Sequence, residues 1–98
     1  MTANYVREVA KRLLEALPPD SVPESDAESL LLLYALLALA KGESVTREDV
    51  HDAWVTWMTL IQKTHPSMRP FSELPRDVQE EDEPFRRAII AVARDEDL

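Results

Sequence analysis

The sequence contains no cysteine, only one glycine, and no apolar run long enough to cross a membrane. A chain without cysteine forms neither disulfides nor thiolate metal sites. A phosphate-binding loop needs several glycines, so the single glycine argues against one. The longest apolar run, residues 30–40, has 11 residues, whereas a membrane-spanning helix needs about 20. Because the first residues also lack the apolar stretch of a signal peptide, we expect a cytoplasmic protein.

Basic residues are also scarce. The chain has 11 Lys and Arg against 19 Asp and Glu, which gives a net charge of −8, and the two halves share the excess equally. Nucleic-acid-binding proteins neutralise phosphates with Lys and Arg, and anionic membranes attract basic segments. We therefore expect neither nucleic acid nor membrane among the partners. The acidity favours solubility, or docking onto a basic protein surface.

The apolar residues that are present recur at helical spacing. They make up 45% of the 98 residues, which is enough for one core. We predict an all-α fold, a compact single domain spanning residues 1–98, with four helices at about 3–17, 25–41, 46–64 and 83–94. A proline-rich but ordered loop should join the third and fourth helices. The second helix is apolar all round and should therefore lie at the centre.

Residues that favour helix ends support these limits. Pro18 and Pro19 should end the first helix. Ser25 and Glu28 have the spacing of a capping box at the start of the second. The other signals are a C-cap at Gly42 and N-caps at Thr46 and Asp82.

No arrangement of residues predicts catalysis or metal binding. His51 and His65 lie far apart in the sequence, and a zinc site needs three or four ligands. Ser67 and Ser72 lack the glycines that frame a nucleophile elbow. The acidic run 80–83 lacks the spaced oxygen ligands and the glycine of a calcium loop. We predict a protein that is not an enzyme, holds no metal and needs no cofactor.

The third helix and the loop that follows it carry the candidates for binding. Trp54 and Trp57 lie on one side of the helix, either both in the core or one as a partly exposed anchor. His51 either flanks a groove or is a structural histidine bonded to a backbone carbonyl. The loop 65–71 is either a recognition surface stiffened by prolines or a stiff connector. We predict a binding groove between helix and loop, lined by His51, Trp54, His65, Arg69 and Phe71.

The order of residues in the second half resembles the ryanodine-receptor repeat domain over residues 49–93. That family has an NVHxxW helix, a KxHPxLVPF/YxxLP loop and an aspartate before its final helix. The matching residues here are His51, Trp54, His65, Pro66, Pro70, Phe71, Leu74, Pro75 and Asp82. The family's GWxxG insertion between helix and loop is missing. The whole chain is similar to small proteins of actinobacteria and their phages.

This resemblance implies a non-enzymatic interaction module that recognises a small anionic, nucleotide-like ligand or a protein partner. A single copy of the repeat would pair with a second chain as a homodimer. In the predicted groove the aromatic rings would stack on the ligand and Arg69 would contact an anion. The alternative is a phage-type acidic inhibitor that covers a basic host protein surface with Glu80, Glu81 and Glu83. A purely structural assembly protein is the third hypothesis.

Overall fold

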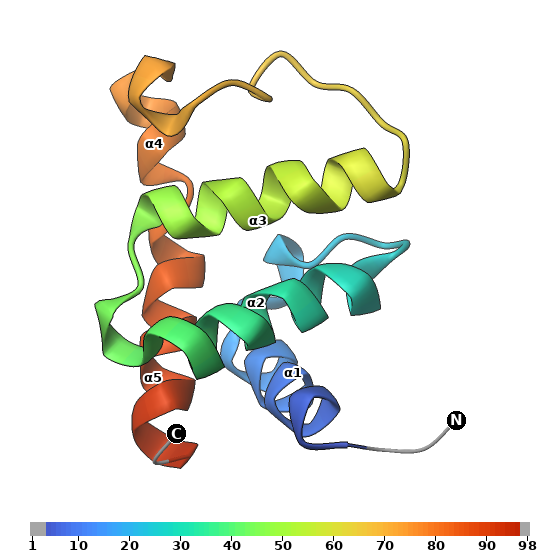
Figure 1. Ribbon diagram of the computed structural model, residues 1–98, viewed down its shortest axis with the longest axis vertical. Coiled ribbons are helices and arrows are strands. Elements are labelled where there is room, and N and C mark those ends of the chain that lie inside the picture. Colours follow the sequence, from blue (N-terminus) through green and yellow to red (C-terminus); the bar gives the residue numbers. More distant parts are fainter. Residues whose placement is uncertain (1–3, 97–98) are drawn as a thin grey trace.

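The computed structural model describes residues 4–96, and the regular structure in that range consists of helices alone. Four of them are long (Figure 1): α1 (Tyr5–Ala16), α2 (Ala27–Lys41), α3 (Arg47–Leu60) and α5 (Glu83–Glu96). The prediction of an all-α fold with four helices and an ordered proline-rich loop is confirmed. The predicted start of the first helix at residue 3 lies outside the described range.

Short elements connect the long helices. Single 3-10 turns occupy Pro19–Ser21, Gly42–Ser44 and Phe71–Glu73, and a helix of five residues, α4 (Arg76–Glu80), precedes α5. The chain from α3 to α4 arches over α3 and returns at the start of α5 (Figure 1). This path places the proline-rich loop beside the helix that was predicted to share a groove with it.

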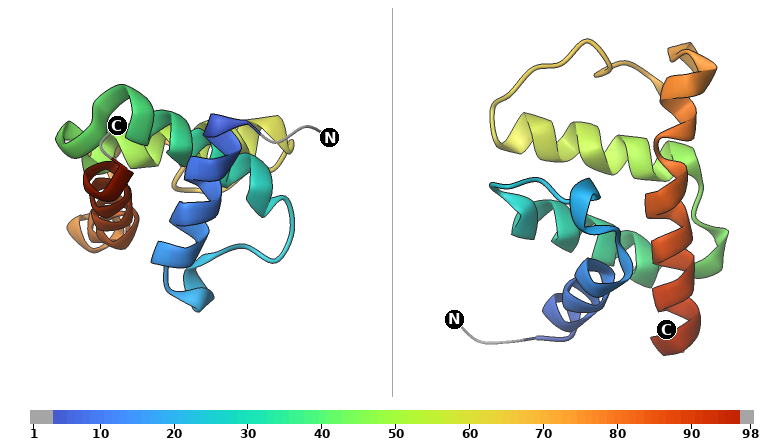
Figure 2. Two further views of the ribbon diagram at one scale, coloured as in Figure 1. Left: turned by 90° about the horizontal axis from the view of Figure 1, so that it is seen from below. Right: turned by 180° about the vertical axis from the view of Figure 1, so that it is seen from behind.

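The helix α2 lies at the centre because its sequence is apolar on every side. It contacts α1, α3 and α5. In Figures 1 and 2, α1 and α3 lie on opposite sides of α2, and α5 crosses both α2 and α3 near their ends. None of the helices within residues 4–96 combines the length and the apolar character that a bilayer span requires.

The core forms where these helices meet. Leu13 of α1, Val50 of α3 and Ile89 of α5 are completely buried against the central helix. On α2 itself, Ala35 and Ala38 are also inaccessible to solvent. Their small side chains let the neighbouring helices approach α2 closely, while leucines fill the space around them.

The start of α2 differs from the prediction. The capping box of Ser25 and Glu28 is wrong, because Asp26 occupies the N-cap position in a left-handed conformation (φ 59°) without a side-chain cap. Glu28 forms an ion pair with Arg7 of α1 instead. The indole N–H of Trp57 in α3 donates to the Asp26 carbonyl at 2.9 Å. A tertiary contact therefore fixes the turn that begins α2.

The caps at Gly42 and Thr46 are confirmed. Gly42 has a positive φ of 56°, and its N–H donates to the Ala38 carbonyl at the end of α2. The Thr46 hydroxyl accepts a hydrogen bond from the Asp49 amide at 3.1 Å, and the Asp49 carboxylate accepts one from the Thr46 amide at 2.9 Å. This reciprocal pair is a capping box at the start of α3.

The helix α3 ends earlier than residue 64, where it was predicted to stop. Gln62 adopts a left-handed conformation (φ 59°), and the Lys63 amide donates to the Met58 carbonyl at 2.9 Å. The bond from Gln62 to Thr59 completes a Schellman motif. Such motifs usually use glycine, so the sequence carried no signal for this one.

The two caps give a matched test of stability. Replacing Thr46 by alanine should lower the free energy of unfolding by about 1 kcal/mol, because the Asp49 amide at the start of α3 loses the hydroxyl to which it donates. Ser25→Ala should change it by less than about 0.3 kcal/mol, since Ser25 is exposed and caps nothing. Urea denaturation of both variants measures the difference. Equal losses would mean that Ser25 also caps a helix.

Candidate functional site

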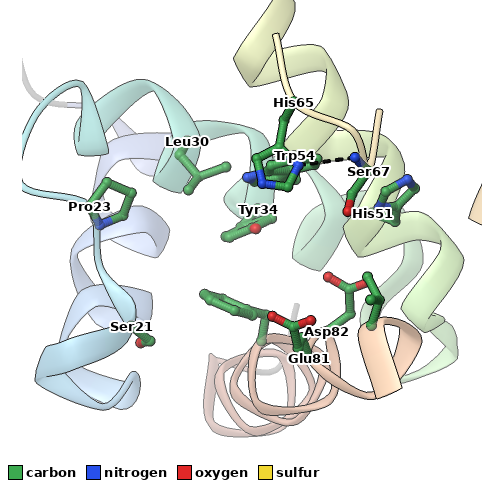
Figure 3. A pocket seen from close by; sticks show the side chains of 12 residues that line it. Ser21, Pro23, Leu30, Tyr34, His51, Trp54, His65, Ser67, Glu81 and Asp82 are labelled. Carbon is green, nitrogen blue, oxygen red and sulfur yellow. Dashed lines mark hydrogen bonds between the residues drawn. The ribbon is translucent and has the colours of Figure 1, made fainter. Parts of the chain in front are cut away.

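A cavity of about 280 Å³ lies among α2, α3, the α4–α5 segment and two loops (Figure 3). The helix α2 contributes Leu30 and Tyr34, which are one turn apart, and α3 contributes His51 and Trp54, which share a face. The connector between α1 and α2 and the start of the proline-rich loop complete the wall. Residues far apart in the sequence therefore surround one small volume.

Tyr34 is the most buried polar side chain of the cavity. The residue is 2% exposed, and its hydroxyl makes no hydrogen bond within residues 4–96. Every side-chain nitrogen or oxygen that is shut off from solvent in that range has a partner, so the hydroxyl opens into the cavity. Burial, with the negative charge of Asp82 nearby, raises the pKa of Tyr34 above its usual value. Tyr34 thus presents a neutral O–H group.

Asp82 directs its carboxylate into the cavity from the opposite side (Figure 3). The prediction that it caps the last helix is wrong: its backbone carbonyl accepts from the Arg86 amide, but its side chain makes no hydrogen bond within the described chain. Burial raises the pKa of Asp82 to about 6, and Glu81 contributes in the same direction. The positive charges of His51 and Arg47 oppose this rise.

His51 connects α3 to the proline-rich loop. It is 3% exposed, and its Nε2 lies 2.7 Å from the Arg69 carbonyl oxygen. A carbonyl only accepts, so Nε2 carries the proton and donates it. The interpretation of His51 as a histidine bonded to a backbone carbonyl is therefore confirmed, and the residue also lines the cavity.

Trp54 and His65 form the upper edge of the cavity. Trp54 is half-buried, and its ring stacks beside His51 with the centroids 5.8 Å apart. The exposed His65 meets the Trp54 ring edge-on at 5.3 Å. Its Nδ1 accepts a hydrogen bond from the Ser67 amide at 3.0 Å, drawn in Figure 3. This bond turns the loop so that His65 faces Trp54.

The structure brings together three of the five predicted site residues, His51, Trp54 and His65, and separates the other two from them. Arg69 is exposed, and its guanidinium donates to the Glu73 carbonyl at 3.2 Å. Arg69 contacts His51 through its backbone carbonyl and not through its guanidinium group. Phe71 is half-buried and packs against the His51 ring at 6.0 Å without lining the cavity.

Tyr34, Asp82 and Phe85 are among the cavity residues that sequence reasoning missed. Tyr34 is the one residue of the apolar run 30–40 with a polar group, and that was its only signal. Asp82 was assigned to a helix cap. Phe85 lies on the inner side of α5, where its ring packs against Tyr34 with the centroids 5.5 Å apart. It therefore looked like an ordinary core residue.

The acidic run 80–83 does not form one negative surface. Glu83 is the centre of an ion-pair cluster with Arg47 at 2.8 Å, Arg86 at 2.9 Å and Arg87 at 3.0 Å. The hydrogen bond from Arg47, followed by the contributions of Arg87 and Arg86, lowers the pKa of Glu83. The cluster ties the start of α3 to the start of α5, and it faces away from the cavity that Asp82 enters.

Metal binding has no obvious place in this arrangement. Within residues 4–96, no three side chains of the metal-ligating types His, Asp and Glu lie close enough together to hold an ion. Asp82 and Glu81 line the cavity from the α4–α5 segment, whereas His51 lines it from α3. The chemistry of the site is that of hydrogen bonds, charge and aromatic surface.

These features define a small all-helical domain with a cavity that is lined by aromatic rings and carboxylates. The chain belongs to the family described as a domain of unknown function, DUF7701, whose model matches residues 4–94. No curated protein and no solved structure matches it.

The resemblance to the ryanodine-receptor repeat is wrong. The matching family spans nearly the whole chain, whereas the repeat was proposed for residues 49–93 and its family is not found. The shared residues have local structural roles, and unrelated chains can use the same residues for the same roles. His51 holds a loop carbonyl, and the side chain of Leu74 is buried beneath the loop.

Asp82 makes stability depend on pH. Its pKa of about 6 in the folded protein exceeds the usual 3.8, so the folded state holds the proton more tightly. Stability should therefore fall as the pH rises from about 4 through 6, by roughly 1–2 kcal/mol once solvent screening of this partly exposed carboxyl is included. Asp82→Asn should remove this fall and raise the melting temperature at pH 7.5, with no gain at pH 3.5. Thermal unfolding across that range measures it; a variant less stable at pH 7.5 would contradict the assignment.

Proposed function

We propose that this protein is a non-enzymatic binding module that takes a small ligand into the cavity between α2, α3 and α5. The ligand is either a free small molecule or a side chain presented by a protein partner in the cytoplasm, a second copy of the chain included. The observation that carries the proposal is the Tyr34 hydroxyl, which belongs to a residue only 2% exposed, opens into the cavity and has no hydrogen-bond partner in residues 4–96.

A hydroxyl that opens into a cavity without a protein partner can bond to whatever enters that cavity. A phenylalanine at position 34 would fill nearly the same space without a polar group, so the hydroxyl suggests a role in contacting something that enters the cavity. The second buried polar residue, His51, supports this view. One of its ring nitrogens is used by the Arg69 carbonyl, and the residue still lines the cavity.

The size and charge of the cavity restrict the ligand. An apolar cavity of about 150 Å³ holds benzene, so about 280 Å³ suits a single ring with a short substituent. No lysine or arginine occurs among the described residues that line it, whereas two carboxylates do. The predicted anionic, nucleotide-like ligand depended on Arg69, which lies elsewhere. We therefore propose a binding role for this cavity, but not for an anionic ligand.

The hydroxyls near the cavity favour binding over nucleophilic catalysis. The Ser21 hydroxyl donates to the Pro18 carbonyl at 2.6 Å, and the contact between Ser67 and His65 uses the serine amide. Neither described serine that lines the cavity is hydrogen bonded through its hydroxyl to a histidine or a carboxylate, which a nucleophile of this type requires.

Nuclear magnetic resonance titration with benzyl alcohol tests the proposal. This neutral probe fits the volume, and its hydroxyl can pair with that of Tyr34. We expect saturable shifts of the amide signals around Tyr34, Trp54 and Phe85, with a dissociation constant on the order of millimolar. Scattered, non-saturating shifts would contradict the proposal.

A matched pair of variants shows whether the probe uses the cavity. Val78→Phe places a ring in the cavity that Val78 lines and should abolish binding. Leu36→Phe makes a similar enlargement on α2, where the side chain is 56% exposed, and should leave binding unchanged. Equal effects of the two variants would place the probe outside the cavity.

A further inference from the structure

Apart from two histidines, the described ionisable side chains that line the cavity without being buried in its aromatic wall are carboxylates. Asp82 and Glu81 extend their carboxylates toward it from the α4–α5 segment, opposite Tyr34 and Trp54 (Figure 3). His51 and Arg47 both act on Asp82, but His51 donates its Nε2–H to the Arg69 carbonyl, and Arg47 is bound to Glu83 at 2.8 Å and does not line the cavity. Asp82 therefore has no hydrogen-bonded cation among the described residues, and a positive group in the cavity would provide one.

An acidic pair alone does not define a site, but the opposite wall gives an independent indication. The Tyr34 hydroxyl, from a residue 2% exposed, faces the same volume without a partner in the described chain. A hydroxyl oxygen has lone pairs that accept from an N–H donor. A donor group placed between the two walls could thus bond to the carboxylate of Asp82 and to the oxygen of Tyr34 together.

The remaining walls are aromatic. Trp54, Tyr34 and Phe85 all line the cavity, with Tyr34 and Phe85 packed at 5.5 Å. The face of an aromatic ring attracts a cation, and the attraction is stronger where water is excluded. The same rings contact the apolar body that carries the charge. Carboxylates on one side and rings on the other form a pocket for a positive group with a compact apolar part.

We infer that the ligand of this cavity is an organic monocation, a protonated amine or guanidinium on a compact apolar body, held between Asp82 and Tyr34. This inference rests on the proposed function, since it names the ligand class for the same cavity. Two kinds of molecule carry such a positive group: a free small amine, or a partner protein with a lysine or arginine side chain.

Calorimetric titration at pH 7.5 with two matched probes tests the charge. Benzylammonium and benzyl alcohol have the same shape, but only the first is a cation. At this pH Asp82 is mostly ionised, given its pKa of about 6. We expect benzylammonium to bind about tenfold more tightly than benzyl alcohol, in line with a charge-assisted hydrogen bond in a partly buried site. Equal or weaker binding of benzylammonium would overturn the inference.

Amino-acid substitutions test which residue causes the preference for benzylammonium. Asp82→Asn should remove the tenfold preference, because the amide that replaces the carboxylate carries no charge. Asp77→Asn removes the same charge from the exposed surface of α4 and should preserve the preference. Tyr34→Phe should weaken benzylammonium several-fold but spare tetramethylammonium, which has no N–H donor. A preference that survives Asp82→Asn, or falls equally with Asp77→Asn, would overturn the assignment to Asp82.

The binding results with the two probes distinguish a failure of the cation inference from a failure of the proposed binding function. If benzyl alcohol binds in the cavity and benzylammonium does not bind better, the cavity is a binding site but its ligand is not a cation. If neither probe binds, both proposals fail. N-acetyl-lysine methylamide stands for a partner's side chain: binding comparable to benzylammonium points to a protein source, and much weaker binding points to a free amine.

Discussion

The fold depends on covering one helix that is apolar on every side. Only 98 residues are available, and α1, α3 and α5 supply the cover for α2. Ala35 and Ala38 are sealed completely by this packing. Nearer the start of α2, Leu30 and Tyr34 also line a cavity, although the Tyr34 ring packs against Phe85 of α5. The cavity is thus a consequence of how three helices cover a fourth.

Much of the fold could be predicted because helical periodicity survives in the sequence. The apolar stripes, the central position of α2 and the caps at Gly42 and Thr46 follow from local chemistry. The predictions failed where contacts between distant residues determine the backbone conformation. Asp26 and Gln62 adopt left-handed conformations that favour glycine, yet neither is glycine. At Asp26 the bond from Trp57 holds the turn, and no local pattern announces a contact between residues so far apart.

The site was predictable in part for the same reason. His51 and Trp54 share a helical face, and His65 begins the loop above them, so their proximity follows from the sequence. The direction of Arg69 does not, because it depends on the path that the loop takes once His51 holds its carbonyl. A charged side chain near a predicted groove suggested an anion. The carboxylates that line the cavity were assigned to a solvated helix start.

The two tryptophans occupy environments that differ sharply over three residues of one helix. Trp57 is 6% exposed, with its indole N–H bonded to the Asp26 carbonyl and the Ser29 hydroxyl, whereas Trp54 borders the cavity beside His65. An aqueous quencher of fluorescence would reach Trp54 and spare Trp57. The protein therefore carries two intrinsic optical reporters, one for the occupancy of its cavity and one for the integrity of its core.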